Sequence, residues 1–498
     1  MDENIIDPAN SIATFHVGQS IFLTGATGFL GKVYIEKILR SCPDVREIFV
    51  LMRPKKGLSI NERLEKILKL PLYNELRKEQ PSNFKKIIPI SGNVIEENLG
   101  ISAVDRQMLT ERVTIIIHSA ASIKFNDSLK YAILNNTRST RDICILAQSM
   151  KNLIALVYVS TTFAHINNNV VKEKVYPPPA DWRKMIKMVE SLDEHIINIF
   201  TTKFLNGFPN TYVYSKNLAE AIIGEYSLSL PCAIIRPSIV SVSINDPFPG
   251  WVDNFYGVTG IFVGGGKGIL RVFNSSKYIC LDVVPVDIVI KNIIITTWKL
   301  GLTTVTTDQP CVLNCANFNQ KNLSLYGIIK MGFDLIKEIP LEGTFWTPNT
   351  IVTDSFSIYY ILTILLHILP AILIDLILKL MKYQPMLIKL QRNVYVANCA
   401  LKHFVHNEWK FENKNALKLL TVVPPKEKKI FSFNLSKVDI KKYYRNAIIG
   451  SKVYLLHEDM NRLDAVKTHY KRVVLFVTTL KTIIVIGLLW MMYKWYST

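Results

Sequence analysis

The sequence predicts an α/β fold: a doubly wound parallel sheet, then a smaller, mainly helical and hydrophobic C-terminal domain with a terminal membrane helix. Three observations support it. Between residues 19 and 243, short β-branched runs alternate with longer helical patterns. A glycine-rich loop directly follows the first of these runs, and two long apolar stretches occur near the end of the chain. Continuous apolar strands separated by helices are typical of a parallel sheet covered on both faces.

Six strands are expected in the first half of the chain, and helical patterns separate several of them. The strands are residues 21–24, 47–52, 86–90, 113–118, 153–160 and 232–237, and the helices are residues 29–40, 128–150 and 212–229. Residues 247–268 are rich in Gly, Pro and aromatics and are interpreted as a long loop. A helix over residues 284–300 and a strand over residues 311–316 are expected to follow.

Composition limits the class of protein. The chain has 498 residues, of which 49% are hydrophobic and 20% charged, so it is not largely disordered. The net charge of +19 favours anionic partners. Seven scattered cysteines without a CxxC pair predict neither a disulfide framework nor a zinc site, and no metal is expected. The acidic start MDENIIDPAN lacks a basic region and an apolar core, so no secretory signal is expected. Most of the chain is therefore expected to be cytosolic.

The C-terminal third contains two apolar stretches. Residues 356–381 are almost wholly apolar, with Pro370 in the middle, which fits a kinked span, a re-entrant hairpin or an interfacial helix. A buried or interfacial helix is favoured over a full crossing, because the uninterrupted part, residues 358–374, is near the lower limit for a span. Residues 473–493 are long enough to cross a bilayer and are expected to form a transmembrane anchor, the alternative being a core helix.

Basic residues surround the second stretch. Lys467, His469, Lys471 and Arg472 precede it and only Lys494 follows it, so the positive-inside rule leaves the main body of the chain cytosolic. Residues 426–445 add seven Lys or Arg, a pattern that attracts anionic lipid headgroups. No nucleic-acid partner is expected, because no nucleic-acid-binding motif accompanies this charge.

The loop Thr24-Gly25-Ala26-Thr27-Gly28-Phe29-Leu30-Gly31 carries the first chemical signal. It follows a strand and opens a helix, as a dinucleotide-binding Rossmann loop requires. Gly25 would allow the tight turn, Gly28 the approach of the pyrophosphate, and Gly31 close packing of helix on strand. Thr24, Thr27 and Phe29 complete the expected cofactor loop.

The end of the second strand separates NAD from NADP. An acidic residue there would hold the ribose 2′-OH, whereas an arginine accommodates a 2′-phosphate. In this chain the strand IFVLM ends at Arg53, 22 residues after Gly31, and Lys55 and Lys56 follow. NADPH is therefore the expected cofactor.

The second signal is Tyr212-Val213-Tyr214-Ser215-Lys216. Tyr212 and Lys216 are four residues apart and share a helix face, so the lysine can stabilise the phenolate and hold the nicotinamide ribose. Tyr214 is the rival phenol, but a spacing of two directs it to another face. A hydroxyl of Ser160 or Thr161, at the end of a strand, can hydrogen-bond the substrate carbonyl beside the tyrosine.

Together these motifs resemble the extended short-chain dehydrogenase/reductases and, more closely, the eukaryotic, insect-type fatty acyl-CoA reductases. The resemblance runs from about residue 15 to the C-terminus. It is carried by FLTGATGFLGKVYIEKILRSCPDVREIFVLMRPKKG, HSAASIKFNDSLKYAILNNTRSTRDICILAQ, VYVSTTFAHIN, NTYVYSKNLAE, IIRPSIV, PFPGWVDNFYGVTGIFVGGGKGILR and VPVDIVI. Domains are expected at residues 15–345 (NADPH-binding, with the substrate-binding part), 346–460 (helical C-terminal domain) and 473–493 (transmembrane helix).

The resemblance implies reduction of a long-chain fatty acyl-CoA to a primary alcohol in two hydride transfers through an aldehyde, with release of CoA. Tyr212 and Lys216 would be the acid and its partner, Thr161 or Ser160 would bind the carbonyl, and Asn136 would support the proton relay of the lysine. Membrane lipid would be a partner, and a homodimer stays open. The endoplasmic reticulum membrane is the expected location, with peroxisome and lipid droplet as alternatives.

Three departures and three alternatives accompany the resemblance, one departure being Asn126-Asp127 where the family has an acidic residue after the KF pair. Gly92-Asn93 stands where a Gly-Asp pair is expected, and His118 replaces a smaller residue near the cofactor. His118 is interpreted as a strand-end histidine with satisfied hydrogen bonds rather than a catalyst. The alternatives are a membrane-tethered sterol dehydrogenase, a sugar-nucleotide enzyme of the same superfamily, and a non-catalytic paralogue that acts as a scaffold.

Overall fold

The computed structural model describes residues 11–303, 309–316, 323–433 and 438–497, which form two units. Unit 1 contains Met1–Phe248, Asp282–Lys321 and Trp409–Val438, and unit 2 contains Pro249–Leu281, Asn322–Glu408 and Asp439–Thr498. The chain therefore passes between the units more than once. The expected boundary between residues 345 and 346 lies inside unit 2.

Unit 1 is built on one parallel sheet, as predicted. Its strands are β1 (Ser20–Thr24), β2 (Glu47–Met52), β3 (Ile87–Ser91), β4 (Ile115–His118), β5 (Ala155–Val159), β7 (Cys232–Pro237) and β11 (Cys311–Cys315). They lie in the order β3-β2-β1-β4-β5-β7-β11 and all pairs are parallel. The strand order reverses between β1 and β4, and ligands of such sheets bind at the carboxyl edge of this switch point.

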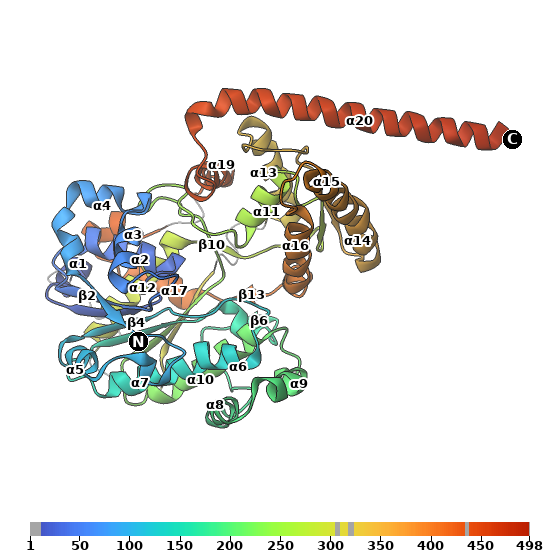
Figure 1. Ribbon diagram of the computed structural model, residues 1–498. Coiled ribbons are helices and arrows are strands. Elements are labelled where there is room, and N and C mark those ends of the chain that lie inside the picture. Colours follow the sequence, from blue (N-terminus) through green and yellow to red (C-terminus); the bar gives the residue numbers. More distant parts are fainter. Residues whose placement is uncertain (1–10, 304–308, 317–322, 434–437, 498) are drawn as a thin grey trace. The chain divides into compact units, whose positions relative to one another are not determined.

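Helices cover both faces of this sheet. Figure 1 shows α2 (Phe29–Ser41) and α12 (Val286–Leu302) on one face, and α5 (Ala103–Arg112), α7 (Ser139–Gln148) and α10 (Thr211–Tyr226) on the other. The helix expected over residues 128–150 consists of α6 (Leu129–Ala132), a π-helical stretch, η4 (Ile133–Arg138), and α7. Because both faces are covered, every residue of β1, β2, β4, β5 and β7 is buried.

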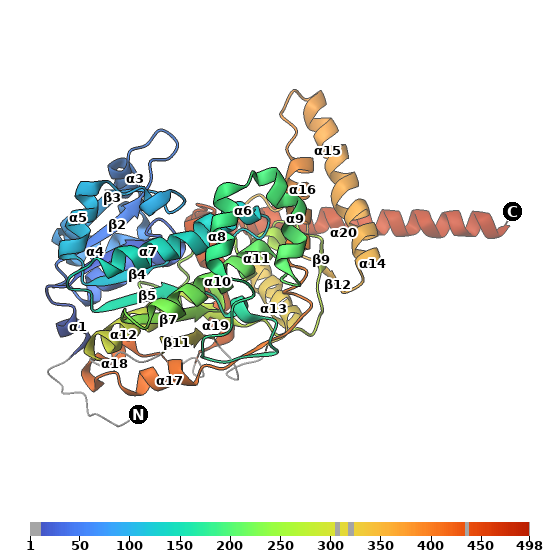
Figure 2. The same ribbon diagram turned by 90° about the horizontal axis from the view of Figure 1, so that it is seen from below.

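The rest of unit 1 consists of short elements. They are α1 (Ile12–Phe15), α3 (Ile60–Leu68), η1 (Pro71–Tyr73), α4 (Asn74–Glu79), η2 (Pro81–Lys86), η3 (Glu97–Gly100), η5 (Thr162–His165), β6 (Val170–Val171), α8 (Trp182–Ser191), α9 (Glu194–Leu205), β8 (Ile239–Ser241), β10 (Val283–Pro285), β13 (Lys410–Phe411), α17 (Lys414–Thr421), η7 (Pro425–Glu427) and α18 (Lys428–Phe431). Figure 2 shows α8 and α9 beside α6, on the face that α10 covers.

A late segment of the chain returns to unit 1. Its strand β13 pairs with β6, and the Glu427 carboxylate accepts the backbone N–H groups of Ile12 and Ala13 at 2.7 and 3.0 Å. These N–H groups lie in the first turn of α1, so the carboxylate caps that helix. The segment from residue 409 to 433 is thus part of the dinucleotide-fold unit although it follows most of unit 2 in sequence.

Unit 2 is mainly helical. It contains α11 (Val258–Gly266), α13 (Leu325–Glu338), α14 (Phe356–Thr363), η6 (Ile364–Ile368), α15 (Leu369–Leu380), α16 (Leu387–Leu401), α19 (Ile440–Gly450), η9 (Ser451–Leu455), η10 (Met460–Arg462), α20 (Leu463–Ser497), and the strand pair β9 (Val272–Asn274) and β12 (Ile351–Thr353). The interpretation of residues 247–268 as one long loop is wrong over α11. Its glycines allow close packing: a Cβ at Gly265 would lie 2.4 Å from the Phe333 ring of α13.

Two helical segments of unit 2 are long and apolar enough to cross a membrane, Phe356–Leu380 and Met460–Ser497. Only 22% and 6% of their apolar windows are buried. The alternative of a buried helix for residues 356–381 is therefore wrong, because most of its apolar surface faces outward.

The basic stretch over residues 426–445 is divided by the fold. Lys426, Lys428 and Lys429 belong to unit 1, whereas Lys441, Lys442 and Arg445 lie on α19 of unit 2. Lys437 and the acidic N-terminal residues 1–10 lie outside the described residues.

Candidate active site

The glycine loop connects β1 to α2 and has the shape that a dinucleotide needs. Gly25 has a φ of +80°, and a Cβ at Gly31 would lie 2.3 Å from the Gly25 carbonyl oxygen. Gly28 is exposed and is the N-cap residue of α2, so free N–H groups of the first helical turn face the space above it. The tight packing at Gly31 and the open N-terminus at Gly28 fit a bound pyrophosphate.

Arg53 directly follows the carboxyl end of β2, as the sequence predicts, and its side chain is exposed. A second arginine, Arg63 of α3, donates a hydrogen bond to the Arg53 backbone carbonyl. Partial burial, with the charge of Arg53 nearby, lowers the pKa of Arg63. The charge of Arg53 acts on Arg63, and nearby cations repel each other unless an anion binds to them, so this corner suits a phosphate.

His118 ends β4 and has both ring nitrogens in hydrogen bonds. Nδ1 lies 2.7 Å from the Thr24 hydroxyl and Nε2 lies 3.2 Å from the Thr140 hydroxyl. Burial, with the nearby charge of Lys216, lowers the pKa of His118 to about 3. The ring is therefore neutral at physiological pH and ties β1 to β4, in accord with the interpretation from the sequence.

Tyr212 lies in the first turn of α10, beside the end of β5. Its phenol lies near the Thr161 hydroxyl, and its ring packs on Phe125 with the centroids 5.8 Å apart. Burial raises its pKa to about 12, although the interaction with Thr161 opposes the shift. Tyr214, the rival phenol, is buried against Phe208. Tyr212 is thus a protonated phenol with a hydroxyl partner at the carboxyl edge of the sheet.

Ser160 and Thr161 differ in their surroundings. The Ser160 hydroxyl donates to the buried Glu220 carboxylate. The Thr161 hydroxyl instead lies near the Tyr212 phenol and donates to the Pro237 carbonyl at 3.4 Å. Successive residues of an extended chain point to opposite sides. The hydroxyl that faces the candidate proton donor is that of Thr161.

Lys216 lies one turn after Tyr212 on α10 and is 2% exposed. Its Nζ donates to the Tyr158 hydroxyl at 3.0 Å and to the Val159 carbonyl at 2.7 Å, and lies over the Tyr158 ring. Burial lowers its pKa to about 7, although the charge of Glu220 opposes the shift. The lysine can therefore gain or lose a proton near neutral pH.

Asn136 lies in the π-helical stretch η4, opposite α10. Its side-chain oxygen accepts the Ser122 N–H at 2.8 Å, and its amide donates to the Ser122 carbonyl and to the Ser215 hydroxyl at 3.1 and 2.9 Å. It thus connects the loop after β4 to the helix that carries Tyr212 and Lys216. These contacts hold both segments in register, and none of them is made to the lysine itself.

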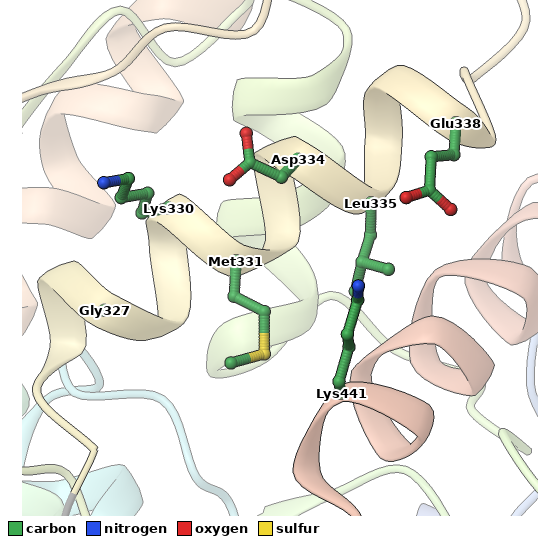
Figure 3. A pocket seen from close by; sticks show the side chains of 7 residues that line it. All are labelled: Gly327, Lys330, Met331, Asp334, Leu335, Glu338 and Lys441. Atoms are coloured by element: carbon green, nitrogen blue, oxygen red, sulfur yellow. The ribbon is translucent and has the colours of Figure 1, made fainter.

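A hollow in unit 2 has a different character. Figure 3 shows it between α13 and Lys441, with Lys330, Asp334 and Glu338 among the side chains that line it. Asp334 is paired with Lys337, and Glu338 with Arg445. Both carboxylates of the hollow are therefore already paired with cations.

Two family models match the chain, both described as male sterility protein: the NAD-binding model over residues 23–293 and the Sterile model over residues 366–458. The chain is 36% identical to fatty acyl-CoA reductase 1 of Homo sapiens over 483 residues, 96% of this chain and 93% of that protein. It is 34% identical to fatty acyl-CoA reductase wat of Drosophila melanogaster over 94% of this chain and 90% of that protein. The chain belongs to the fatty acyl-CoA reductase family.

Solved structures support the fold of this family member. The terminal R domain of the myxalamid pathway matches with a TM-score of 0.57 and 19% identity, covering 87% of this chain and 90% of that one. The R domain of a nonribosomal peptide synthetase from Mycobacterium tuberculosis matches with a TM-score of 0.56 and 16% identity, covering 90% and 96%. Family membership favours an acyl-CoA reductase over the sterol and sugar-nucleotide alternatives.

Sequence reasoning missed the polar network beneath this reductase site. Glu220 is fully buried, and Arg236 and His165 both contact its carboxylate, the latter at 2.7 Å. Burial alone would raise the pKa of Glu220, but the Arg236 and His165 charges hold it well below its usual range. The signal was present in the sequence, since Tyr212, Lys216 and Glu220 recur every four residues and form one stripe on α10.

Proposed function

We propose that this chain reduces long-chain fatty acyl-CoA to the primary fatty alcohol with two molecules of NADPH, through an aldehyde and with release of CoA thiol. The observation that carries the proposal is the contact between the Thr161 hydroxyl and the Tyr212 phenol, one helical turn from Lys216, in a member of the fatty acyl-CoA reductase family. The substrate class follows from the names of the relatives together with this geometry.

The cofactor would be held by the residues of the carboxyl edge. Thr24, Gly25, Thr27, Gly28, Phe29 and Gly31 would form the pyrophosphate loop, and Lys216 would hold the nicotinamide ribose. Bound NADPH supplies the hydride for each step. Arg53 at the end of β2, with the charge of Arg63 nearby, supports NADPH over NADH, because positive charge at this position suits a 2′-phosphate.

The protein's own part is to bind and neutralise the oxygen of the reacting carbonyl. Thr161 and Tyr212 present two hydroxyl donors to this oxygen, which becomes negative as hydride arrives. A phenol whose pKa is about 12 keeps its proton at neutral pH and can give it to the alkoxide of the alcohol. Protonated Lys216 would stabilise the resulting phenolate, and Tyr158 and Val159 hold its ammonium in place.

The other candidate residues take supporting roles in this proposal. The Ser160 hydroxyl donates a hydrogen bond to the Glu220 carboxylate. It therefore stabilises the end of β5 and does not bind the substrate. Asn136 positions the loop after β4 against α10. Both act through other residues, so they are positioning residues and not groups that touch the carbonyl.

The proposed setting is a membrane. The apolar window of the C-terminal segment is only 6% buried, and residues 473–493 within α20 are long enough to span a bilayer. The positive charge before it supports a cytosolic face for unit 1. We assign the endoplasmic reticulum as the default organelle, with peroxisome and lipid droplet as the alternatives.

The test uses full-length protein in detergent with NADPH and a panel of saturated and unsaturated acyl-CoAs, and gas chromatography of the extracted products. We expect fatty alcohol from the wild type, and a loss of about 10²–10⁴-fold in rate for Tyr212→Phe, the range for removal of a general acid. Tyr214→Phe is the matched control, because it removes a phenol of the same helix that is packed against Phe208.

Two results would contradict the proposal. NADPH binding without alcohol or aldehyde from any acyl-CoA would favour the scaffold alternative. Equal losses in Tyr212→Phe and Tyr214→Phe would show that Tyr212 is not the proton donor.

A further inference from the structure

The continuous helix from Phe356 to Leu380 has two faces of opposite character. Five side chains at intervals of four residues are buried and form one stripe: Tyr359, Thr363, His367, Ala371 and Asp375. The opposite side exposes large aliphatic side chains, all at least 45% exposed: Ile358, Ile361, Leu365, Leu369, Ile372, Leu373, Leu376, Ile377 and Leu380. We call this opposite side the aliphatic face.

The buried stripe attaches the helix to the body of unit 2 along its length. Near its N-terminal end, the Tyr359 ring stacks on Tyr395 of α16 with the planes 9° apart. In the middle, His367 Nε2 accepts the backbone N–H groups of Arg271 and Val272, at 2.9 and 3.1 Å. These contacts hold the centre of the helix against β9.

The C-terminal end of the stripe is attached as well. The Asp375 carboxylate accepts three backbone N–H groups at the start of α16, those of Met386, Leu387 and Ile388, at 2.9–3.0 Å. This carboxylate satisfies N–H groups that the helix itself cannot bind. His367 and Asp375 thus face the protein, on the side of the helix opposite the aliphatic face.

The composition of the aliphatic face favours lipid as its occupant. Its members are Leu and Ile, with Phe356 and Tyr360 exposed at the N-terminal end of the helix, whereas protein interfaces rely on Trp, Tyr and Arg at their energetic centres. Exposed basic residues lie at the Leu380 end, Lys379 and Lys382 on this segment and Lys389 and Arg392 on α16, which suits anionic headgroups. Unit 2 also carries α20, the candidate anchor, so this face belongs to the unit that would be held at a membrane.

The attachment of the stripe decides how the helix can meet the bilayer. If it crossed the membrane, its midpoint at His367 would carry Arg271 and the strand β9 that it binds into the hydrocarbon. A charged side chain and a two-stranded sheet are not tolerated there. A helix that lies in the plane of the interface keeps its buried stripe on the protein and immerses only the opposite face.

We propose that the helix Phe356–Leu380 lies flat in the membrane interface, with its aliphatic face among the lipid acyl chains. It would be a second lipid contact of unit 2, in addition to α20. An interfacial helix of this kind is immersed by about 5–10 Å. The proposal does not rest on the proposed reaction, because no residue of unit 1 enters the argument.

The experiment measures immersion depth in the full-length protein reconstituted in vesicles of phosphatidylcholine and phosphatidylserine. Cys280, Cys311 and Cys399 are replaced by serine, and one spin label at a time is placed at position 361, 369 or 376 of the aliphatic face. Labels at position 484 of α20 and at the exposed position 145 of unit 1 serve as membrane and aqueous references. Collisions with oxygen and with a water-soluble nickel complex report the depth of each label.

We expect all three labels on the aliphatic face to favour oxygen over nickel and to have the same shallow depth within a few ångströms. A crossing helix would instead place positions 361 and 369 about 12 Å apart along the bilayer normal, because a helix rises 1.5 Å per residue. That result, or full nickel access at all three positions, would overturn the proposal. A water-accessible label at position 484 alone would contradict the anchor and leave the interfacial contact standing.

A charge on the face provides a second check in the same chain. In proteins labelled at position 369 or 376, Leu373→Asp is expected to raise nickel access, because a carboxylate draws this side of the helix toward water. Ile145→Asp adds the same charge on unit 1 and is expected to leave both labels unchanged. Unchanged depth in the Leu373→Asp proteins would show that lipid does not hold this face.

Discussion

The candidate site of unit 1 and the apolar helices of unit 2 place their polar and apolar side chains in opposite ways. Unit 1 buries charges: Lys216, Glu220 and Arg236 are each at most 2% exposed. Unit 2 exposes aliphatic residues, with Leu373 at 62% and Leu380 at 77%. Buried charges and exposed aliphatic side chains both destabilise the folded state of an isolated soluble domain. Each arrangement therefore indicates a role other than stabilising the fold.

The difference shows that burial serves different purposes in the two units. In unit 1 it moves the pKa of Lys216 to about 7 and that of Tyr212 to about 12, which sets the proton chemistry of the site. In unit 2 the buried polar groups His367 and Asp375 bind backbone N–H groups and hold a helix in position. The predictions below test whether unit 1 controls chemistry and unit 2 controls attachment.

After Tyr212→Phe, the largest effect is expected at Thr161. Thr161→Val should lower kcat for alcohol formation by about 10²–10³-fold, because it removes one donor to the developing oxyanion. Thr161→Ser keeps the hydroxyl and should recover most of the rate. The measurement is steady-state product formation with NADPH in excess.

The neighbouring residue is the matched control for Thr161. Ser160→Ala should keep kcat within a few-fold, but it removes a donor to the buried Glu220 and should lower the free energy of unfolding by about 1–3 kcal/mol. Thermal unfolding of each variant separates the two effects. If Ser160→Ala lost as much activity as Thr161→Val at unchanged stability, the assignment of the carbonyl-binding hydroxyl would be reversed.

A smaller effect is expected from the arginine pair at the end of β2. Arg63→Ala should weaken NADPH binding by about 10–100-fold and leave NADH binding unchanged, since hydrogen bonds to charged groups contribute about 1.5–3 kcal/mol. Lys66→Ala removes a charge from the exposed side of the same helix α3 and is the control. Equal weakening for both cofactors would show that Arg63 does not bind a 2′-phosphate.

Much of unit 1 could be predicted from the sequence, because its signals are local. The apolar runs mark each strand of the sheet, and the spacing of Tyr212 and Lys216 places them on one helix face. The choice between Ser160 and Thr161 could not be made, because it depends on which side of β5 faces α10. The roles of Glu220 and of the segment after residue 409 depend on contacts between residues far apart in sequence.

Unit 2 was harder to predict for a physical reason. Hydropathy alone does not distinguish a buried apolar helix from an exposed one, and residues 356–381 fit both. The four-residue interval from Tyr359 to Asp375 marks the buried side of this helix. That side could not be identified from the sequence, because the partners of its polar residues lie on β9 and α16, far away in sequence. Glycines of residues 258–266 suggested a loop, whereas close packing against α13 makes them helical.

The charge state of Lys216 gives a pH-dependent prediction. Because its pKa lies at about 7, raising the pH from about 6 to 8 removes most of its positive charge. NADPH binding should therefore weaken through this range, by up to about tenfold per pH unit above 7. Lys216→Gln should bind NADPH more weakly at low pH and remove this dependence. Fluorescence titration at each pH measures it, and an identical profile in both proteins would exclude Lys216 as the titrating group.

The smallest effect, and the one that most directly tests the separation of the two units, is expected at Asp375. Asp375→Asn removes the charge that binds three N–H groups at the start of α16, a loss of about 0.5–2 kcal/mol. Hydrogen exchange at Met386–Ile388 should accelerate by about 2–30-fold, the same energy expressed as local opening. Asp354→Asn, at an exposed position, is the control. NADPH affinity should stay unchanged, since no cofactor residue lies in unit 2. A weaker affinity in Asp375→Asn would show that attachment and chemistry are energetically coupled, and the contrast between the units would then describe one cooperative structure rather than two.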